Sequence, residues 1–212
     1  MDEDSYLTPA RGAEGEFVER RSRFIGAIRP VKDEREALAF LEERRKRFWD
    51  ASHNVYAYVL REGQSRRYSD DGEPQGTAGI PVLEVLLREG LTDCAVVITR
   101  YFGGVLLGAG GLTRAYARGA KTAVDAGGAV LMRRCTRAVI VCDYAQYGRA
   151  SSLVSEEEGR VIDTRYTDRV EIEFLLPRER LEPAGARLTD LSAGSLLIEP
   201  MGEEYAPFPV EK

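Results

Sequence analysis

A run of glycines between an apolar segment and a helix-like segment constrains this chain more than any other feature. Residues 103–111 hold five glycines in nine positions, shortly after the strand-like apolar run 94–99. A glycine-rich turn that leads into a helix exposes backbone N–H groups at the positive end of the helix dipole, so it can hold a phosphate or a carboxylate. The alternative is that the glycines only permit sharp turns and close packing between helix and sheet.

The predicted anion or nucleic-acid contacts follow from this loop and from the helix that we expect to begin near Leu112. The loop does not end in Gly-Lys-Ser/Thr, and it lacks the acidic residue expected downstream of a dinucleotide fingerprint, so neither nucleotide motif is present. Arginines before and after the loop can add charge-assisted contacts. The predicted contact residues are Arg100, Tyr101, Gly103, Gly104, Gly108, Gly110, Gly111, Arg114 and Arg118.

A second polar segment, residues 68–79, precedes the loop and carries three carboxylates within four residues. Oxygen ligands of this kind suit a divalent cation, but the spacing is not that of an EF-hand, and Asp-Gly and Pro are ordinary turn residues. A structural turn or a partner contact is favoured over a metal, and neither a metal nor a cofactor is predicted. The predicted ligand or partner contacts are Ser69, Asp70, Asp71, Glu73, Gln75 and Thr77, together with His53 and Asn54.

His53 is the single histidine of the chain. A zinc site with two or more histidines is therefore excluded, and any His-dependent nucleophilic arrangement would have to use this residue. A lone histidine is more often a hydrogen-bonded structural residue than a general base. No catalytic residue is predicted.

Composition and charge narrow the class of protein. Hydrophobic residues form 43% of the chain and charged residues 31%, which is typical of a globular protein rather than a disordered one. No apolar run approaches the ~20 residues of a membrane span, so a cytoplasmic location without membrane contact is expected. The three cysteines form no CxxC pair and are interpreted as small core residues.

The pattern of apolar residues predicts two α+β domains, residues 16–133 and 134–212. The first fifteen residues are interpreted as a loose lead-in. A strand or hairpin is predicted over 17–28, a helix from Asp33, strands over 55–60 and 94–99, and a short helix over 80–88. The basic run 44–47 with Phe48 and Trp49 is interpreted as a solvated helix face. In the second domain, strands over 135–142, 160–166, 169–176 and 195–199 and helices over 145–158 and 178–191 give the order βαββαβ, which is ferredoxin-like.

Charge differs between the predicted domains. Residues 16–133 carry 19 Lys and Arg against 16 Asp and Glu, a net charge of +3, whereas residues 134–212 carry 10 against 15, a net charge of −5. This asymmetry allows an anionic partner on the first domain and argues against nucleic-acid binding over the whole surface.

Several ordered blocks resemble the IMPACT family. They are Ser52-His53-Asn54 before a strand, residues 69–79, residues 100–104, residues 108–112 and Arg114-Ala115-Tyr116, and the two-domain length resembles the family's bacterial YigZ branch. The resemblance implies a first domain with the left-handed βαβ fold of a ribosomal protein and of domain IV of elongation factor G, and a ferredoxin-like second domain similar to domain V of that factor. Eukaryotic members regulate translation. Val55 and Leu106 depart from the family, since cysteine and lysine are common at these two positions.

Three functions are compatible with these features. The leading hypothesis is a binding or regulatory protein whose first domain contacts RNA or the translation machinery, such as the ribosome, through the glycine loop and residues 70–77. The second is an enzyme acting on a phosphorylated or carboxylated small molecule bound at the glycine loop, with His53 or Asp70 as the acid-base group. The third is a protein-protein adaptor whose acidic second domain is the contact surface.

Overall fold

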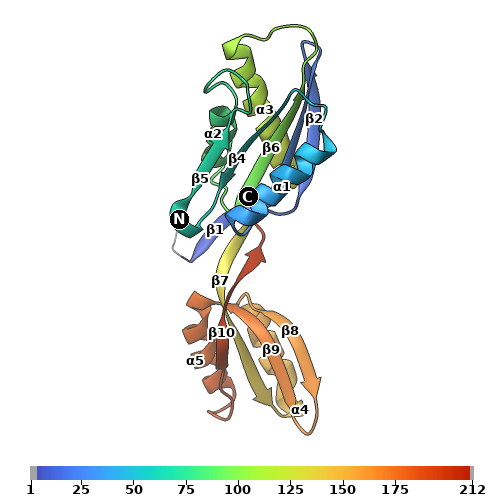
Figure 1. Ribbon diagram of the computed structural model, residues 1–212. Coiled ribbons are helices and arrows are strands. Elements are labelled where there is room, and N and C mark those ends of the chain that lie inside the picture. Colours follow the sequence, from blue (N-terminus) through green and yellow to red (C-terminus); the bar gives the residue numbers. More distant parts are fainter. Residues whose placement is uncertain (1–3, 211–212) are drawn as a thin grey trace. The chain divides into compact units, whose positions relative to one another are not determined.

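The computed structural model describes residues 4–210 and divides into two compact units (Figure 1). Within the described residues, the first unit comprises 6–131 with 209–210, and the second comprises 132–208 with 4–5. Each unit encloses its own cluster of buried apolar side chains, which is what separate domains are expected to have.

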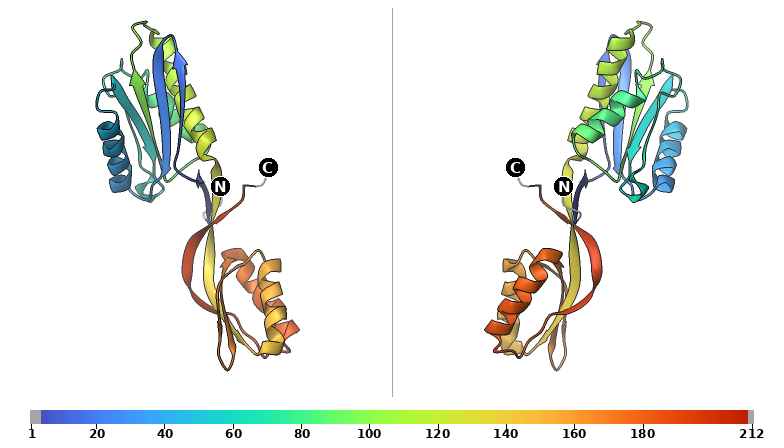
Figure 2. Two further views of the ribbon diagram at one scale, coloured as in Figure 1. Left: turned by 90° about the vertical axis from the view of Figure 1, so that its right-hand side faces the viewer. Right: turned by 90° about the vertical axis from the view of Figure 1, so that its left-hand side faces the viewer.

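An antiparallel sheet of five strands forms the centre of the first unit. Its order is β2 (Ala13–Glu19), β3 (Ser22–Pro30), β6 (Cys94–Tyr101), β4 (His53–Val59) and β5 (Arg66–Ser69). Helix α1 (Glu34–Arg47) covers one face, and α2 (Gly79–Arg88) and α3 (Ala109–Gly127) cover the other (Figure 2). A short 3-10 turn, η1 (Glu62–Gln64), joins β4 to β5.

Because helices cover both faces of this sheet, its central strands are apolar on both sides. Along β6, Val96 and Ile98 pack toward α2 and α3, whereas Ala95 and Val97 pack toward α1. This two-sided burial explains the unbroken apolar run that the sequence shows at this strand. Asp33 caps α1 by accepting a hydrogen bond from the Glu36 amide at 2.8 Å, as a helix start at this residue predicts.

The second unit has the predicted βαββαβ order. It consists of β7 (Ala129–Cys142), α4 (Tyr144–Glu156), β8 (Arg160–Tyr166), β9 (Val170–Pro177), α5 (Leu181–Leu191) and β10 (Glu199–Phe208), with the 3-10 turn η2 (Arg178–Arg180) before α5. β7 pairs with β9, β9 with β8, and β10 with β7, which is the strand arrangement of a ferredoxin-like sheet. The α+β prediction is therefore confirmed.

Two strand predictions are wrong. The amino-terminal segment is not a loose lead-in, because β1 (Ser5–Pro9) pairs with β7 and β2 already begins at Ala13. The last strand begins at Glu199 rather than at 195, because Ser195 still belongs to the turn after α5. Its amide and its hydroxyl both donate to the Ser192 carbonyl, at 3.1 and 2.8 Å.

The basic run at the end of α1 is only partly solvated. Arg44 is 2% exposed, donates to Glu14 at 2.7 Å and lies over the Phe48 ring, so the prediction of a solvated face is wrong for this residue. The three cysteines are buried and unpaired, as predicted. Burial raises the pKa of the Cys135 thiol to about 11, so this side chain is no thiolate at neutral pH. No helix within residues 4–210 is long and apolar enough to cross a bilayer.

Candidate functional site

A buried polar cluster lies beside the β6–α3 loop and links β6, α3 and the segment 70–78. Arg100 Nη1 donates to Glu73 Oε1 at 2.5 Å, and the Tyr116 hydroxyl donates to the same oxygen at 2.6 Å. The side chains of Arg100 and Glu73 are only 5% and 4% exposed. Burial and the hydrogen bond to Glu73 raise the pKa of Tyr116 above its usual range, so its hydroxyl remains a proton donor.

Two polar atoms of this cluster, Arg100 Nε and Glu73 Oε2, have no hydrogen-bond partner within residues 4–210. Arg100 Nη2 donates to the Ser22 hydroxyl at 3.3 Å, but Arg100 Nε is buried without a partner. Glu73 Oε2 has no hydrogen-bond partner among residues 4–210, because both hydrogen bonds of this carboxylate end on Oε1. Oε2 is not one of the fully buried polar atoms without a partner, so this oxygen is accessible and can accept from water or a ligand.

His53 is the first residue of β4 and is oriented by the backbone. Its Nδ1 lies 2.8 Å from the Asp71 carbonyl oxygen. A carbonyl only accepts, so Nδ1 carries the proton in this contact and Nε2 is the lone-pair nitrogen of the neutral ring. Nε2 lies 3.8 Å from Glu73 Oε1. The second nitrogen of His53 is thus held close to the carboxylate of Glu73.

Other predicted contacts of the segment 69–77 hold the loop in place. Asp70 accepts from the amides of Gly76, Ala78 and Gly79 at 2.8 to 3.1 Å and thereby caps the start of α2. Ser69 Oγ accepts from the Asp71 amide, and the Thr77 hydroxyl donates to the Pro74 carbonyl. Gln75 is exposed.

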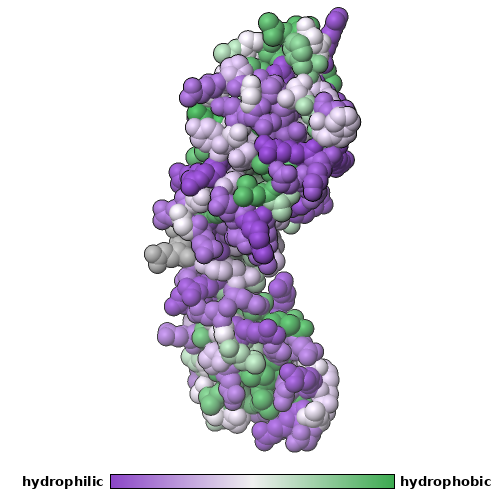
Figure 3. All heavy atoms as spheres, viewed as in Figure 1, coloured by the Kyte–Doolittle hydropathy of each residue, from purple (hydrophilic) through white to green (hydrophobic). Residues whose placement is uncertain are grey.

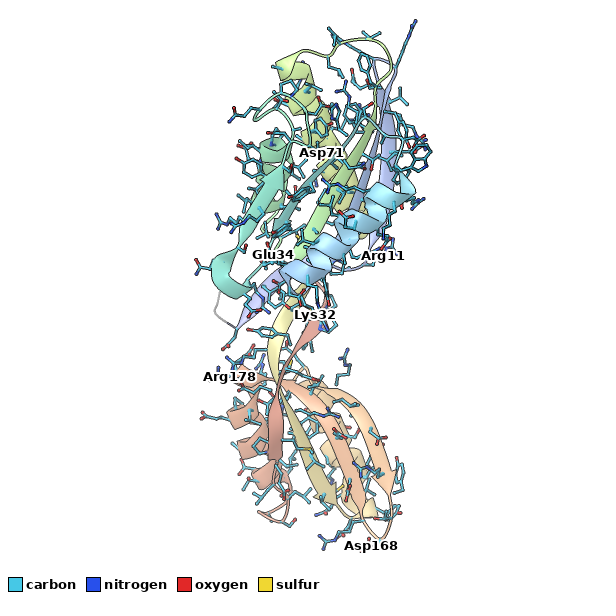
Figure 4. All side chains as sticks on the ribbon, viewed as in Figure 1. Arg11, Lys32, Glu34, Asp71, Asp168 and Arg178 are labelled. Atoms are coloured by element: carbon cyan, nitrogen blue, oxygen red, sulfur yellow. The ribbon has the colours of Figure 1, made fainter. Side chains whose placement is uncertain are left out.

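Asp71 is also fully used within the fold. Its Oδ2 accepts from the Asn54 amide at 2.6 Å and its Oδ1 accepts from Arg45 at 3.0 Å. The Asn54 side chain in turn accepts from the Thr99 hydroxyl. Figure 4 shows Asp71 in the half of the first unit that carries the β6–α3 loop. The three carboxylates do not converge, and no group of three His, Cys, Asp or Glu side chains suited to a metal occurs in the described part of the chain.

The glycines of the β6–α3 loop have different roles. A Cβ at Gly103 would lie 2.1 Å from the Arg21 backbone, so this glycine permits the β2–β3 turn to pack on the loop. Its amide donates to the Ser22 hydroxyl. Gly104 and Gly108 have φ of +81° and +73°, which other residues adopt at a cost. Close packing therefore accounts for Gly103, and chain reversal accounts for Gly104 and Gly108.

The amino terminus of α3 remains open. The first helical bond runs from the Leu112 amide to the Gly108 carbonyl, so the amides of Ala109, Gly110 and Gly111 precede it. Gly108 provides no side-chain cap. Three donors at the positive end of a 19-residue helix are thus available to an acceptor from outside.

Two hollows flank Leu107 at this end of the first unit. The larger, of about 380 Å³, is called the apolar hollow because most of its lining is apolar, with His53, Glu73 and Arg100 as polar members; the rest of its lining is Pro74, Phe102, Leu106, Leu107, Gly108, Ala109 and Leu112. The smaller, of about 230 Å³, is called the basic hollow; it is lined by Glu19, Arg20, Leu107, Gly111, Arg114, Ala115 and Arg118. Figure 3 shows apolar side chains at this end of the unit. Leu106, which lines the apolar hollow, is 81% exposed.

The β2–β3 turn adds a feature that the sequence analysis missed. Arg20 and Arg21 form its two central residues, with φ of 44° and 67°. Such turns favour Asn-Gly, because most side chains are strained at positive φ. An arginine pair between two strand-like segments is the signal that would have drawn attention to this turn. Strain of this kind gathers at functional positions, and Arg20 lies in the basic hollow.

The predicted site residues therefore fall into four groups. His53, Glu73, Arg100 and Gly108 line the apolar hollow, and Gly111, Arg114 and Arg118 line the basic hollow. Gly110 lies in the first turn of α3 and Gly104 in the loop. The rest brace the surroundings: Tyr101, for example, donates its hydroxyl to Asp50 at 2.7 Å.

Comparison with known proteins finds a known domain family in each unit. Residues 20–124 match the Impact N-terminal domain, and residues 140–195 match a domain of unknown function, DUF1949. The chain is 36% identical to IMPACT family member YvyE of Bacillus subtilis, over 90% of this chain and 88% of that protein, and 34% identical to IMPACT family member YigZ of Escherichia coli, over 92% and 97%. Protein IMPACT of Bos taurus is 36% identical over 43% of this chain and 30% of its own length.

One solved structure is similar over nearly the whole chain. It is described as the crystal structure of a hypothetical protein, and it is 33% identical, with a TM-score of 0.60, over 94% of this chain and 98% of its own. This similarity extends across both units.

Proposed function

Because the chain belongs to the IMPACT family, whose bacterial members it matches over most of their length, we propose that its first unit binds RNA, as part of contact with the translation machinery. Family membership itself points to a binding or regulatory protein. The observation that carries the finer proposal is the open amino terminus of α3 beside the basic hollow.

The basic hollow has the chemistry to hold a phosphate. The free amides of the first turn of α3 lie next to exposed arginines, and amides together with guanidinium groups are strong ligands of phosphate oxygens. Arg20 and Arg114 have no ion-pair partner in the described part of the chain, while Arg118 lies 3.6 Å from Glu19 at the surface. An exposed pair of this kind is worth little and is easily replaced by a phosphate contact.

Apolar side chains at the same end favour RNA over a bare inorganic anion. Phe102 is 47% exposed and Leu106 is 81% exposed, so both present apolar surface to solvent. Proteins that bind single strands combine basic grooves with aromatic and apolar surfaces on which bases stack. The net charge of +3 on residues 16–133 supports weak or structure-specific binding, not tight nonspecific binding.

Salt dependence of RNA binding tests the proposal. Fluorescence anisotropy with the full chain and a labelled single-stranded RNA is measured over a range of salt concentrations, for the natural chain and for Arg20→Gln/Arg114→Gln. Loss of two phosphate contacts lowers the slope of log affinity against log salt by about 1.4, since each contact contributes about 0.7 on a single strand. Arg35→Gln is the matched control, because Arg35 is 87% exposed on α1 and away from both hollows. Equal slopes for all three proteins, or no binding to any RNA, would overturn the proposal.

The second candidate function is an enzyme acting on a phosphorylated or carboxylated small molecule. The specific observation in its favour is the fixed tautomer of His53, whose Nε2 faces the carboxylate of Glu73 beside a hollow large enough for a small ligand. A thermal-shift screen with nucleotides, sugar phosphates and dicarboxylates, with and without magnesium, separates the two functions. A small anion that raises Tm in a chain that fails to bind RNA would favour the enzyme.

A further inference from the structure

Glu73 Oε2 and His53 Nε2 give the apolar hollow an edge made of hydrogen-bond acceptors. Glu73 Oε1 is occupied by Arg100 and Tyr116, but Oε2 has no partner among residues 4–210 although the side chain is 96% buried. His53 Nδ1 is committed to the Asp71 carbonyl, which leaves the lone pair of Nε2 on the side of Glu73. A ligand that completes this edge must bring N–H donors.

The apolar walls of the hollow favour a ligand that is flat or apolar. Pro74, Phe102, Leu106, Leu107 and Leu112 supply them, and the volume of about 380 Å³ lies in the usual range for small-molecule sites, about 300–1,000 Å³. Arg100 lies 5.5 Å from the centre of the Phe102 ring, which holds the aromatic side chain at the mouth of the hollow. A planar ring with an N–H edge fits both demands.

Leu107 and the amino terminus of α3 connect this hollow to the basic one. Leu107 lines both, and successive α3 residues divide between them, with Ala109 in the apolar hollow and Gly111 in the basic hollow. A ligand with a ring in one hollow and a phosphate at the other is a nucleotide. Sequence-specific proteins read RNA in this way, by taking an unstacked base into a pocket.

We infer that the apolar hollow is a subsite for one unpaired base that carries an exocyclic amino group, which donates to Glu73 Oε2. This inference rests on the proposed RNA binding and adds a preference to it. Cytosine, adenine and guanine present such an amino group, whereas uracil presents carbonyl oxygens instead. Uracil has one ring N–H, but it lies between two carbonyl oxygens, so a pose that brings this N–H to Glu73 also places a carbonyl beside the acceptors of this edge and uracil is disfavoured.

Cytosine and uracil isolate the amino group, because the two rings have the same size. Anisotropy competition with the full chain compares short oligomers of cytidylate and uridylate at one salt concentration. The natural chain is expected to bind the cytidylate oligomer more tightly by at least about fivefold, the lower end of what a good base contact contributes. Glu73→Gln is expected to abolish the preference, because an amide presents both a donor and an acceptor. The salt slope is measured in the same variant, because it reports the phosphate contacts separately from the base contact.

A second variant keeps the test decisive if Glu73→Gln fails to fold. Ala109→Leu adds bulk at an exposed position that lines the apolar hollow, and it leaves the α3 amides in place. It is expected to remove the preference while preserving salt-dependent binding. Equal affinity of the natural chain for both oligomers, with salt-dependent RNA binding intact, overturns the base subsite and leaves the proposed function standing. Absence of binding to either oligomer overturns both.

Discussion

The ion pair between Arg100 and Glu73 provides the sharpest test of how the site is held together. Arg100→Met removes the guanidinium and retains most of the aliphatic volume. The carboxylate of Glu73 then remains buried with the Tyr116 hydroxyl as its main partner. Breaking a buried pair by removal of one member costs about 3–5 kcal/mol, because the other charge is left uncompensated. This is a large share of the 5–15 kcal/mol that stabilises a typical domain.

The double replacement Arg100→Met/Glu73→Met should cost less than Arg100→Met alone. Two apolar side chains then fill the volume, and only the Tyr116 and Ser22 hydroxyls lose partners. Replacing both members of a buried pair is often neutral or stabilising, whereas removing one is not. The two single variants and the double variant thus form a cycle with a coupling energy that is far from additive.

Urea unfolding provides the free energies for this cycle. Far-UV circular dichroism follows the unfolding of both units, and amide hydrogen exchange at the buried strand β6 follows the first unit. Arg35→Met, on the exposed face of α1, is the matched control and should change stability by less than about 0.5 kcal/mol. If Arg100→Met costs no more than this control, or if the double variant is the least stable of all, the reasoning about the buried pair is refuted.

Three further predictions follow from single contacts. Gly103→Ala should destabilise the first unit by about 1–3 kcal/mol because its Cβ would meet the Arg21 backbone, whereas Gly110→Ala should be nearly neutral because it meets only the flexible Arg114 side chain; thermal unfolding compares the two. Asp70→Ala should cost about 1–3 kcal/mol, since three amides at the start of α2 lose their acceptor, and loss of amide-exchange protection at these positions measures it. Burial, and after it the hydrogen bond to Glu34, raises the pKa of Tyr58 in the folded protein from 10.0 to about 12. The stability that Tyr58 contributes is therefore complete below pH 10 and is lost as pH rises through 12. Tyr58→Phe should flatten this alkaline decline in the free energy of unfolding, and an unchanged decline would contradict the assignment.

Much of the fold could be predicted because local pattern and tertiary burial agree in it. The apolar run that forms β6, the Asp33 cap of α1 and the order of elements in the second unit all carry strong local signals. β1 could not be predicted, because five residues interrupted soon by Pro9 and Gly12 give no periodicity, and the pairing with β7 that stabilises them lies more than a hundred residues away. Burial of Arg44 also escaped prediction, because it depends on Glu14 from a distant strand.

The sequence indicated which residues belong to the candidate site but not how their side chains are arranged in space. Its glycine loop and its carboxylate segment are local features that can be read directly from the sequence. The sequence does not reveal that Glu73 and Arg100, 27 positions apart, share one buried bond. The arginine pair at 20–21 was the available signal for Arg20, but turn propensity favours Asn-Gly at such a position and assigns no role to arginine.

Asp70, Asp71 and Glu73 lie in one segment, but the first two serve the fold alone whereas Glu73 can also serve a ligand. Both oxygens of Asp70 accept backbone amides, and both oxygens of Asp71 accept from Asn54 and Arg45. Each of these carboxylates is saturated, so it can serve a ligand only if the loop opens. Glu73 alone has one oxygen committed to the fold and one left over in a hollow. A substitution at Asp70 or Asp71 should therefore alter stability first and binding only as a consequence, whereas Glu73→Gln should alter binding directly and also lower stability, because it leaves the buried charge of Arg100 unpaired.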